Sequence, residues 1–265
     1  MLERDRRPAH TPRVTSSAEF TDPRLVAAYD TLNVYEPGSQ PDFYLELAQE
    51  VRASTVIDVG SGTGLVSTQL ARAGVDVIGL EPSESMLALA RHRPGGERVR
   101  WILGDVSELA SHRADMAFMA GHVAQFFIAD ADWHDALTAI HGALRPGATF
   151  AFESRNPQVQ AWKSWTRSRT RRTVLDPVLG PIETWVAEAN ASGGVVETVA
   201  RYRFADSGDV LTARTSLRFR SLTELEESLS ARGFAVTDVY GAWDRRPWSD
   251  RDEEIIVVAR RLPDQ

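Results

Sequence analysis

The stretch from Val56 to Pro82, VIDVGSGTGLVSTQLARAGVDVIGLEP, decides how the chain is expected to fold. Its first residues are apolar and β-branched, which is typical of a buried parallel strand. A glycine-rich loop follows, then a segment with helical spacing that ends at Gly74, and then a second apolar run that ends at Glu81. A strand, a glycine loop, a helix and a strand in this order predict a nucleotide-binding α/β domain.

The same alternation continues on both sides of this unit. Helices are expected at residues 22–33 and 41–51 before it, and strands are expected in VRWILGD, ADMAFMAG and ATFAFES after it. Residues 222–233 form a further expected helix, which two final strands follow. Short links between strands and helices predict a Rossmann-like, mostly parallel sheet with helices on both faces.

The alternation is interrupted after the fifth strand. Residues 156–220 contain alternating strands joined by NASGG and DSGD, and both of these segments are hairpin turn signals. We therefore expect an antiparallel β insertion that forms a lid over the substrate, whereas residues 22–155 and 221–265 form the cofactor-binding core. Residues 1–21 are polar and are expected to form a disordered tail.

The composition argues against several classes of protein. The 265 residues carry a net charge of −7, without the basic surplus that nucleic-acid-binding proteins show. There is no cysteine, which excludes disulfides, thiolate metal sites and cysteine nucleophiles and fits a reducing cytoplasm. No stretch of about 18 uncharged apolar residues predicts a membrane span, and the polar N-terminal residues lack the apolar segment of a secretory signal. We expect a cytoplasmic protein without nucleic-acid or membrane partners.

The spacing and charge of the glycine loop separate two classes of nucleotide-binding enzyme. A dinucleotide fingerprint has its third glycine three positions after the second, but Leu65 stands there and the third glycine is Gly64. Asp58 opens the loop, and its carboxylate repels a pyrophosphate but attracts a ligand that carries a sulfonium and an α-amino group. The loop therefore favours a cationic nucleoside ligand. An NAD(P)-dependent oxidoreductase and a non-catalytic cofactor-binding protein are the alternatives.

These motifs resemble those of the class I S-adenosylmethionine-dependent methyltransferases of the small-molecule type. VIDVGSGTG is similar to the first motif of this family and GLEPSESML to its second, and GDV and RPGATFAFES are similar to later ones. The resemblance covers most of the chain apart from the N-terminal residues and the insertion. It implies a seven-stranded sheet whose last strand is antiparallel. It also implies S-adenosyl-L-methionine as cofactor and S-adenosyl-L-homocysteine as product, with no metal.

The resemblance also implies which residues surround the cofactor. Glu81 is expected to hold the ribose hydroxyls, and Asp105 is expected to meet the adenine amine. Tyr29, followed by Asp30, is similar to a Tyr-Asp pair that closes over the cofactor in related enzymes. The expected cofactor-binding residues are Tyr29, Asp58, Gly60, Ser61, Gly62, Glu81, Pro82, Ser83, Met86, Gly104, Asp105, Val106, Gly121 and His122.

Methyl transfer makes modest demands on catalytic residues. It is an in-line displacement at a carbon that the sulfonium already activates, so the protein mainly aligns the reactants and excludes water. A general base helps where the nucleophile carries a proton that must leave. His122 follows the fourth strand, at the carboxyl edge where ligands bind in open α/β sheets, and is the candidate base. A purely structural hydrogen bond is the alternative role for His122.

The insertion is expected to select the methyl acceptor. The (Asp/Asn)-Pro-Pro-aromatic motif of nucleic-acid amine methylation is absent, and MAGHVAQFF stands in its place. Five of the seven tryptophans follow Ser154, which indicates either a pocket for an apolar or flat acceptor or an extra core layer. The basic run at residues 167–172 is either a solvated face or a contact for an acidic substrate. We expect methylation of an N or O atom of a small molecule, with acceptor contacts from Arg155, Asn156, Trp162, Trp165 and Trp185.

Overall fold

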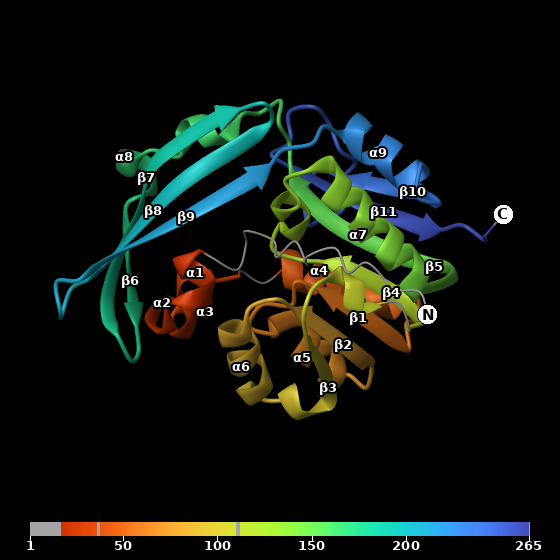
Figure 1. Cartoon of the computed structure of the whole chain (residues 1–265), viewed down its shortest axis with the longest axis horizontal. Helices are drawn as coiled ribbons and strands as arrows, with labels where there is room; N and C mark the ends of the chain where they lie inside the picture. The colour runs from red at the N-terminus through yellow and green to blue at the C-terminus, as the bar shows by residue number, and fades with distance from the viewer. Residues whose placement is uncertain (1–16, 36–37, 110–111, 265) are drawn as a thin grey trace, which may run out of the picture.

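The computed structural model describes residues 17–35, 38–109 and 112–264. It contains a seven-stranded sheet of order β10-β11-β5-β4-β1-β2-β3 and a four-stranded sheet of order β6-β7-β8-β9. Figure 1 shows the four-stranded sheet standing beside the core, with the N-terminal helices between the two. The strands of the larger sheet are β1 (Thr55–Val59), β2 (Asp76–Glu81), β3 (Val99–Leu103), β4 (Ala114–Met119), β5 (Leu144–Arg155), β10 (Phe234–Tyr240) and β11 (Glu254–Arg261).

The topology of the larger sheet confirms the predicted fold class. Strands β1 to β5 pair in parallel, and β11 runs antiparallel to both β5 and β10. Parallel strands need crossovers, and α5 (Leu65–Arg72), α6 (Glu84–His92) and α7 (Asp130–Ala143) each lie in one of them. The other two longer helices are α4 (Gln40–Glu50), which precedes β1, and α9 (Leu222–Ser230), which precedes β10.

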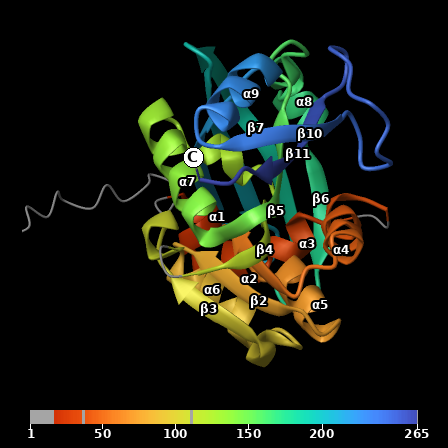
Figure 2. The ribbon, with the colours of Figure 1, turned by 90° about the vertical axis from the view of Figure 1, so that its right-hand side faces the viewer.

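Helices cover both faces of the larger sheet, as Figure 2 shows for α7 on one side and α4 and α5 on the other. Phe43 and Leu70 belong to the apolar layer beneath α4 and α5, and Trp133 and Leu229 belong to the layer beneath α7 and α9. The central strands read as continuous apolar runs because both of their faces are buried. The carboxyl ends of β1, β2 and β4 consequently meet at one edge of a rigid scaffold.

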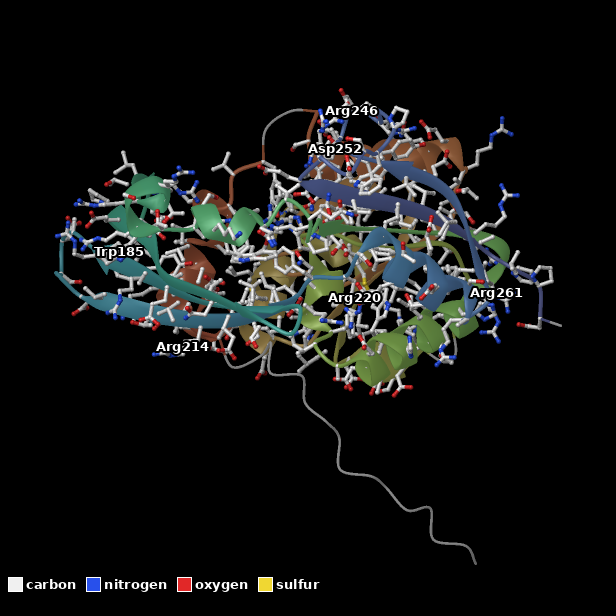
Figure 3. All side chains as sticks on the ribbon, turned by 90° about the horizontal axis from the view of Figure 1, so that it is seen from above. Trp185, Arg214, Arg220, Arg246, Asp252 and Arg261 are labelled. Carbon is white, nitrogen blue, oxygen red and sulfur yellow. The ribbon has the colours of Figure 1, made fainter. Side chains whose placement is uncertain are left out.

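The insertion follows β5 directly and forms the separate antiparallel sheet that was predicted. Its strands are β6 (Arg172–Asp176), β7 (Gly180–Ser192), β8 (Val195–Phe204) and β9 (Val210–Arg218). Gly193 and Gly194 connect β7 to β8 with positive φ angles, as a tight hairpin requires. A short helix α8 (Arg167–Thr170) precedes the sheet. Seen from above in Figure 3, Trp185 and Arg214 mark the insertion, and Arg261 marks the opposite end of the molecule.

The N-terminal segment differs from the prediction in two respects. Residues 17–21 were expected in a disordered tail but form α1 (Ala18–Thr21), where Phe20 packs against Phe126 and Tyr29; the remainder of that predicted tail lies outside the described residues. The helix expected at 22–33 is split into α2 (Pro23–Ala27) and α3 (Tyr29–Leu32) at Ala28. The packing of aromatic side chains from distant segments orders α1, which local polarity does not reveal.

None of the helices in the described part of the chain has the length and apolar character needed to cross a membrane. Helix α1 contacts both α6 of the core and β9 of the insertion, α2 contacts α6, and α3 contacts β6. These three helices therefore connect the two sheets.

A glycine in β2 provides a test of the packing between β2 and β3. A Cβ on Gly79 would lie 2.4 Å from the Trp101 ring, which a 2.8 Å hydrogen bond from its indole N–H to the Gly96 carbonyl holds in place. We expect Gly79→Ala to lower the free energy of unfolding by about 1–3 kcal/mol because the core has no room for it. The measurement is urea unfolding followed by circular dichroism.

Gly142 in α7 is the matched control. A Cβ there meets nothing within 4 Å, and its φ is not positive. Gly142→Ala should raise the free energy of unfolding by up to about 1 kcal/mol, the helix propensity difference. Equal effects of the two substitutions would contradict the assigned packing.

Candidate functional site

A cavity of about 860 Å³ opens at the carboxyl ends of β1, β2 and β4, between the core and the insertion. Ligands bind at this edge in open α/β sheets. The glycine loop and the segments after β2, β3 and β4 form one end of the cavity. The inner surface of the insertion and helices α1 and α3 form the other end. The cavity is large enough for a nucleoside cofactor and a second small molecule.

Nearly all residues that the resemblance implied for the cofactor line this cavity. Ser83 is the exception, because its hydroxyl accepts a hydrogen bond from the Met86 amide as the N-cap of α6 and donates one to the Phe20 carbonyl. The residues that line it are Tyr29, Asp58, Gly60, Ser61, Gly62, Glu81, Pro82, Met86, Gly104, Asp105, Val106, Gly121 and His122. The structure thus brings these residues together, and their cofactor contacts stay a prediction.

The glycine loop turns sharply and presents open backbone to the cavity. Gly60 has a φ of 76°, and a Cβ on it would lie 2.6 Å from Val123. Gly62 has a φ of 54°, and the position of its missing Cβ has nothing within 4 Å. Between them, the buried Ser61 hydroxyl has no hydrogen-bond partner among the described residues. A buried hydroxyl without a partner costs free energy, so this arrangement suits a ligand that completes it.

Two buried carboxylates flank the loop. Glu81 accepts hydrogen bonds of 2.8 Å from the amides of Gly62 and Ser83, and Asp58 accepts one of 2.6 Å from the Ser67 hydroxyl. Burial raises the pKa of Asp58 to about 7, although the Ser67 hydrogen bond opposes the shift. Burial also raises the pKa of Glu81, against the opposing effect of the two amides. Two anions kept out of water at one place favour a cationic ligand.

His122 lies at the other side of the cavity, with a left-handed backbone (φ 59°) just after β4. Its amide donates a 2.7 Å hydrogen bond to the buried Glu153 carboxylate, which Tyr44 and Gln40 also contact. Its Nε2 lies 2.9 Å from the Glu254 carboxylate. When Nε2 donates its proton to Glu254, the neutral ring keeps Nδ1 as its proton-accepting nitrogen. This geometry is compatible with a histidine base oriented by a carboxylate, and the base role of His122 stays a prediction.

A polar latch joins the N-terminal helices to the glycine loop. The Thr63 hydroxyl donates a 2.7 Å hydrogen bond to the Asp30 carboxylate. Arg93, after α6, forms an ion pair with Asp30 and donates a 2.8 Å hydrogen bond from Nε to the Thr63 carbonyl. Arg93 was not among the predicted site residues because it follows a helix with no motif. This latch holds Asp30 beside the loop, and the preceding residue, Tyr29, lines the cavity.

The predicted acceptor residues divide into two groups. Arg155, Trp165 and Trp185 line the cavity, whereas Asn156 and Trp162 do not. The Asn156 amide is buried and donates 2.9 Å hydrogen bonds to the carbonyls of residues 250 and 252. Trp162 packs edge-on against Phe219 with 4.8 Å between ring centroids. Asn156 thus joins the start of the insertion to the segment before β11, and Trp162 packs within the insertion; a residue's position after a strand reveals neither role.

Several cavity residues were not predicted from the sequence. Cross-strand partners in β7 and β8 bring Thr184 next to Tyr202, and partners in β8 and β9 bring Thr198 next to Thr215. These hydroxyl-bearing side chains line the cavity from the insertion, and Arg169 and Arg172 line it near α8. The alternation along β7 to β9 contained this signal, but it does not say which face of the sheet is turned inward.

Comparisons with known proteins agree with this geometry. Residues 56–147 match a family model described as a methyltransferase domain. The cypemycin N-terminal methyltransferase of a Streptomyces species is 24% identical over 253 residues, which are 93% of this chain and 99% of that protein.

Solved structures show the same fold. The CcbJ methyltransferase from Streptomyces caelestis superposes with a TM-score of 0.70 at 21% identity, over 89% of this chain and 96% of that one. CalS10, an amino pentose methyltransferase from Micromonospora echinaspora whose structure has S-adenosylmethionine bound, superposes with a TM-score of 0.66 at 22% identity, over 89% and 95%. The class I methyltransferase fold predicted from the sequence is confirmed.

The burial of Asp58 predicts a pH-dependent stability. Its carboxyl group has a folded-state pKa of about 7 against 3.8 in the unfolded chain, so its ionisation opposes folding as the pH rises from about 4 to 7. Asp58→Asn keeps an acceptor for the Ser67 hydroxyl and removes this charge. The variant should be more stable than the parent by a few kcal/mol at pH 8, with a difference that shrinks towards pH 4. Thermal unfolding across this pH range is the measurement.

Asp115 supplies the opposite control. Burial is the largest single effect on its pKa and raises it, but hydrogen bonds from Ser54 and Thr55 and an ion pair with Arg145 together outweigh burial and hold the pKa at about 2. Asp115→Asn should lower stability near neutral pH, by an amount that diminishes as the pH falls from 4 towards 2. If Asp58→Asn is less stable than the parent at pH 8, the raised pKa assigned to Asp58 is wrong.

Proposed function

We propose that this class I methyltransferase transfers a methyl group from S-adenosylmethionine to an amine nitrogen of a small-molecule acceptor. The observation that carries the proposal is a single cavity in which a carboxylate-flanked glycine loop faces the polar and aromatic wall of the insertion. The first end suits a cationic nucleoside, and the second end leaves room for the molecule that receives the methyl group.

The residues at the glycine loop fit the proposed cofactor. Asp58 and Glu81 would balance its positive charges, and the Ser61 hydroxyl would gain the partner that it lacks among the described residues. The lone pairs that Glu81 does not use for amide hydrogen bonds are available to ribose hydroxyls. Asp105 and Met86 line the cavity beyond Glu81, where they would border the base. A dinucleotide would instead bring phosphates to two buried carboxylates, which repel them.

Bound S-adenosylmethionine supplies a methyl carbon that its sulfonium makes electrophilic. The chain's own residues hold the acceptor nitrogen in line, exclude water with helices α1 and α3, and remove a proton where the nitrogen carries one. His122, oriented by Glu254, is the proposed base, with its backbone held by Glu153.

The choice of nitrogen rests on the related proteins together with this base. The names of two of them, an N-terminal methyltransferase and an amino pentose methyltransferase, specify amine-bearing acceptors. An amine must be neutral to act as a nucleophile, and a histidine base beside the cavity meets that need.

Cofactor binding provides the first test. We expect S-adenosylmethionine and S-adenosylhomocysteine to bind in isothermal titration, and NADH and NADPH not to bind. Glu81→Ala should weaken cofactor binding by at least about tenfold, or 1.4 kcal/mol, because it removes both the carboxylate and the anchor of the loop amides. Glu84→Ala, an exposed substitution outside the cavity, is the matched control and should change nothing. Binding of NADH without S-adenosylhomocysteine would overturn the proposal.

The proposed base provides the second test. Asparagine tolerates the left-handed backbone at this position, but its amide side chain is not a base, so His122→Asn removes the proposed proton acceptor. With an amine acceptor from a screened panel, kcat should fall by roughly 10² to 10⁴, while cofactor affinity should stay within a few fold. Glu254→Gln should lower kcat less, because it removes the charge but keeps a hydrogen-bonding group. His134→Ala, outside the cavity, is the control. Unchanged kcat in His122→Asn would remove His122 as the base.

A further inference from the structure

The two ends of the cavity carry side chains of opposite charge. Asp58, Glu81 and Asp105 line the end at the glycine loop, and three arginines line the end at the insertion. The carboxylates match the positive charge of the proposed cofactor, so the arginines are left without a role in binding it. They are Arg155, Arg169 and Arg172.

Arg155 is the deepest of these arginines and has donors to spare. Its Nη1 donates a 2.9 Å hydrogen bond to the Gln125 side chain, and its guanidinium carbon lies 5.5 Å from the centre of the Trp165 ring. A guanidinium has five N–H donors. The hydrogen bond to Gln125 is the one that the Arg155 side chain donates to a described residue. Burial lowers the pKa of the Arg155 guanidinium, although the charges of Glu254, Glu153 and Glu253 oppose the shift.

Arg155 has no carboxylate partner in the described part of the chain, although a glutamate lies opposite it on the neighbouring strand. Arg155 at the end of β5 is the register partner of Glu254 at the start of β11, so their Cβ atoms are neighbours. Glu254 nevertheless contacts His122, and among residues 17–35, 38–109 and 112–264 no carboxylate lies within 4 Å of the Arg155 guanidinium. The guanidinium is therefore available to a ligand in the cavity.

The basic run at residues 167–172 supplies the other two arginines. Arg167 lies over the Trp185 ring at 5.0 Å, and Arg171 forms an ion pair with Glu183. Arg169 and Arg172 line the cavity instead. Arg172 donates a 2.5 Å hydrogen bond to the Leu32 carbonyl. Neither of these two forms an ion pair with a described residue, so the run contributes to the cavity two arginines that lack a carboxylate partner among those residues.

The insertion end of the cavity also contains a carboxyl group, that of Glu19, which forms no ion pair with the arginines. Glu19 of α1 lines the cavity and accepts a hydrogen bond from the Tyr202 hydroxyl. Burial raises the pKa of Glu19, against the opposing effect of that hydrogen bond. It forms no ion pair with an arginine of the described chain, so the insertion end keeps its positive charge.

We propose that the acceptor bears an oxyanion, a carboxylate or a phosphate, which Arg155 binds and which Arg169 and Arg172 attract into the cavity. Arginine binds both groups through paired N–H donors, and a desolvated guanidinium gains most from such a partner. The inference deepens the proposed function, on which it rests. It narrows the acceptor to an acidic amine, whose neutral analogues bind poorly.

Matched ligands test this without knowledge of the natural acceptor. The protein, saturated with S-adenosylhomocysteine, is titrated with phenylacetate, phenyl phosphate and the neutral phenylacetamide. We expect the two anions to bind at least about tenfold more tightly than the amide, with an affinity that falls as salt rises. The tighter of the two anions identifies the oxyanion as carboxylate or phosphate. Equal binding of phenylacetamide and both anions would overturn the inference.

Variants assign the effect to Arg155. Arg155→Gln should remove at least about nine-tenths of the anion affinity and leave phenylacetamide binding unchanged. Arg155→Lys, which keeps the charge but not the paired donors, should show an intermediate loss. Arg214→Gln makes the same charge change on an exposed position of β9 outside the cavity lining, in the insertion lobe of Figure 3, and should bind as the parent does. Parental anion affinity in Arg155→Gln would overturn the inference.

The same experiment separates the two proposals. If S-adenosylhomocysteine binds but the anions show no preference over the amide, the acidic acceptor is wrong and the methyltransferase proposal stands. If S-adenosylhomocysteine does not bind, the proposed function is wrong, and the anion preference of the unliganded protein with its loss in Arg155→Gln still decides whether Arg155 forms an oxyanion site.

Discussion

The attachment of the glycine loop to the end of β2 is the constraint on which the site depends. The amides of Gly60 and Ser61 donate hydrogen bonds of 2.8 and 3.0 Å to the Leu80 carbonyl, and the Gly62 amide donates to the Glu81 carboxylate. Three successive loop amides are therefore held by two successive residues of the neighbouring strand. Loop and carboxylate keep one relative position before any ligand arrives, which lowers the entropy cost of binding.

That attachment concentrates negative charge in a place that water hardly reaches. Asp58 is the second-last residue of β1 and Glu81 is the last residue of the neighbouring β2, and the charge of Glu81 raises the pKa of Asp58 in addition to the larger effect of burial. A fold under selection for stability alone would replace one of them with a neutral residue. Their presence is better explained by a ligand whose positive charge offsets the cost, as expected where function and stability oppose each other.

The sequence predicts the core well because its strands are buried on both faces and read as apolar runs between recognisable turns. It predicts the insertion as antiparallel from NASGG and DSGD, but not which face is turned inward, since alternation is the same for both. It fails for α1, which Phe20 orders by packing against Phe126 more than a hundred residues away, and for Asn156, whose partners lie in the segment before β11. In both cases the deciding contact is distant in sequence.

Glu254 lies at the site because the last strand is antiparallel, and for the same reason its position in the sequence does not predict a site residue. Parallel strands present their carboxyl ends at the ligand edge, and an antiparallel strand among them presents its amino end there. Glu254 begins β11 and so lies opposite Arg155, which ends β5. An ion pair between Glu254 and Arg155 would neutralise both charges, so that Glu254 could not orient His122 and Arg155 could not bind a ligand. Glu254 contacts His122 and Arg155 contacts Gln125 instead, so the same pair of strand ends holds both the proposed base and the proposed oxyanion-binding cation beside one cavity.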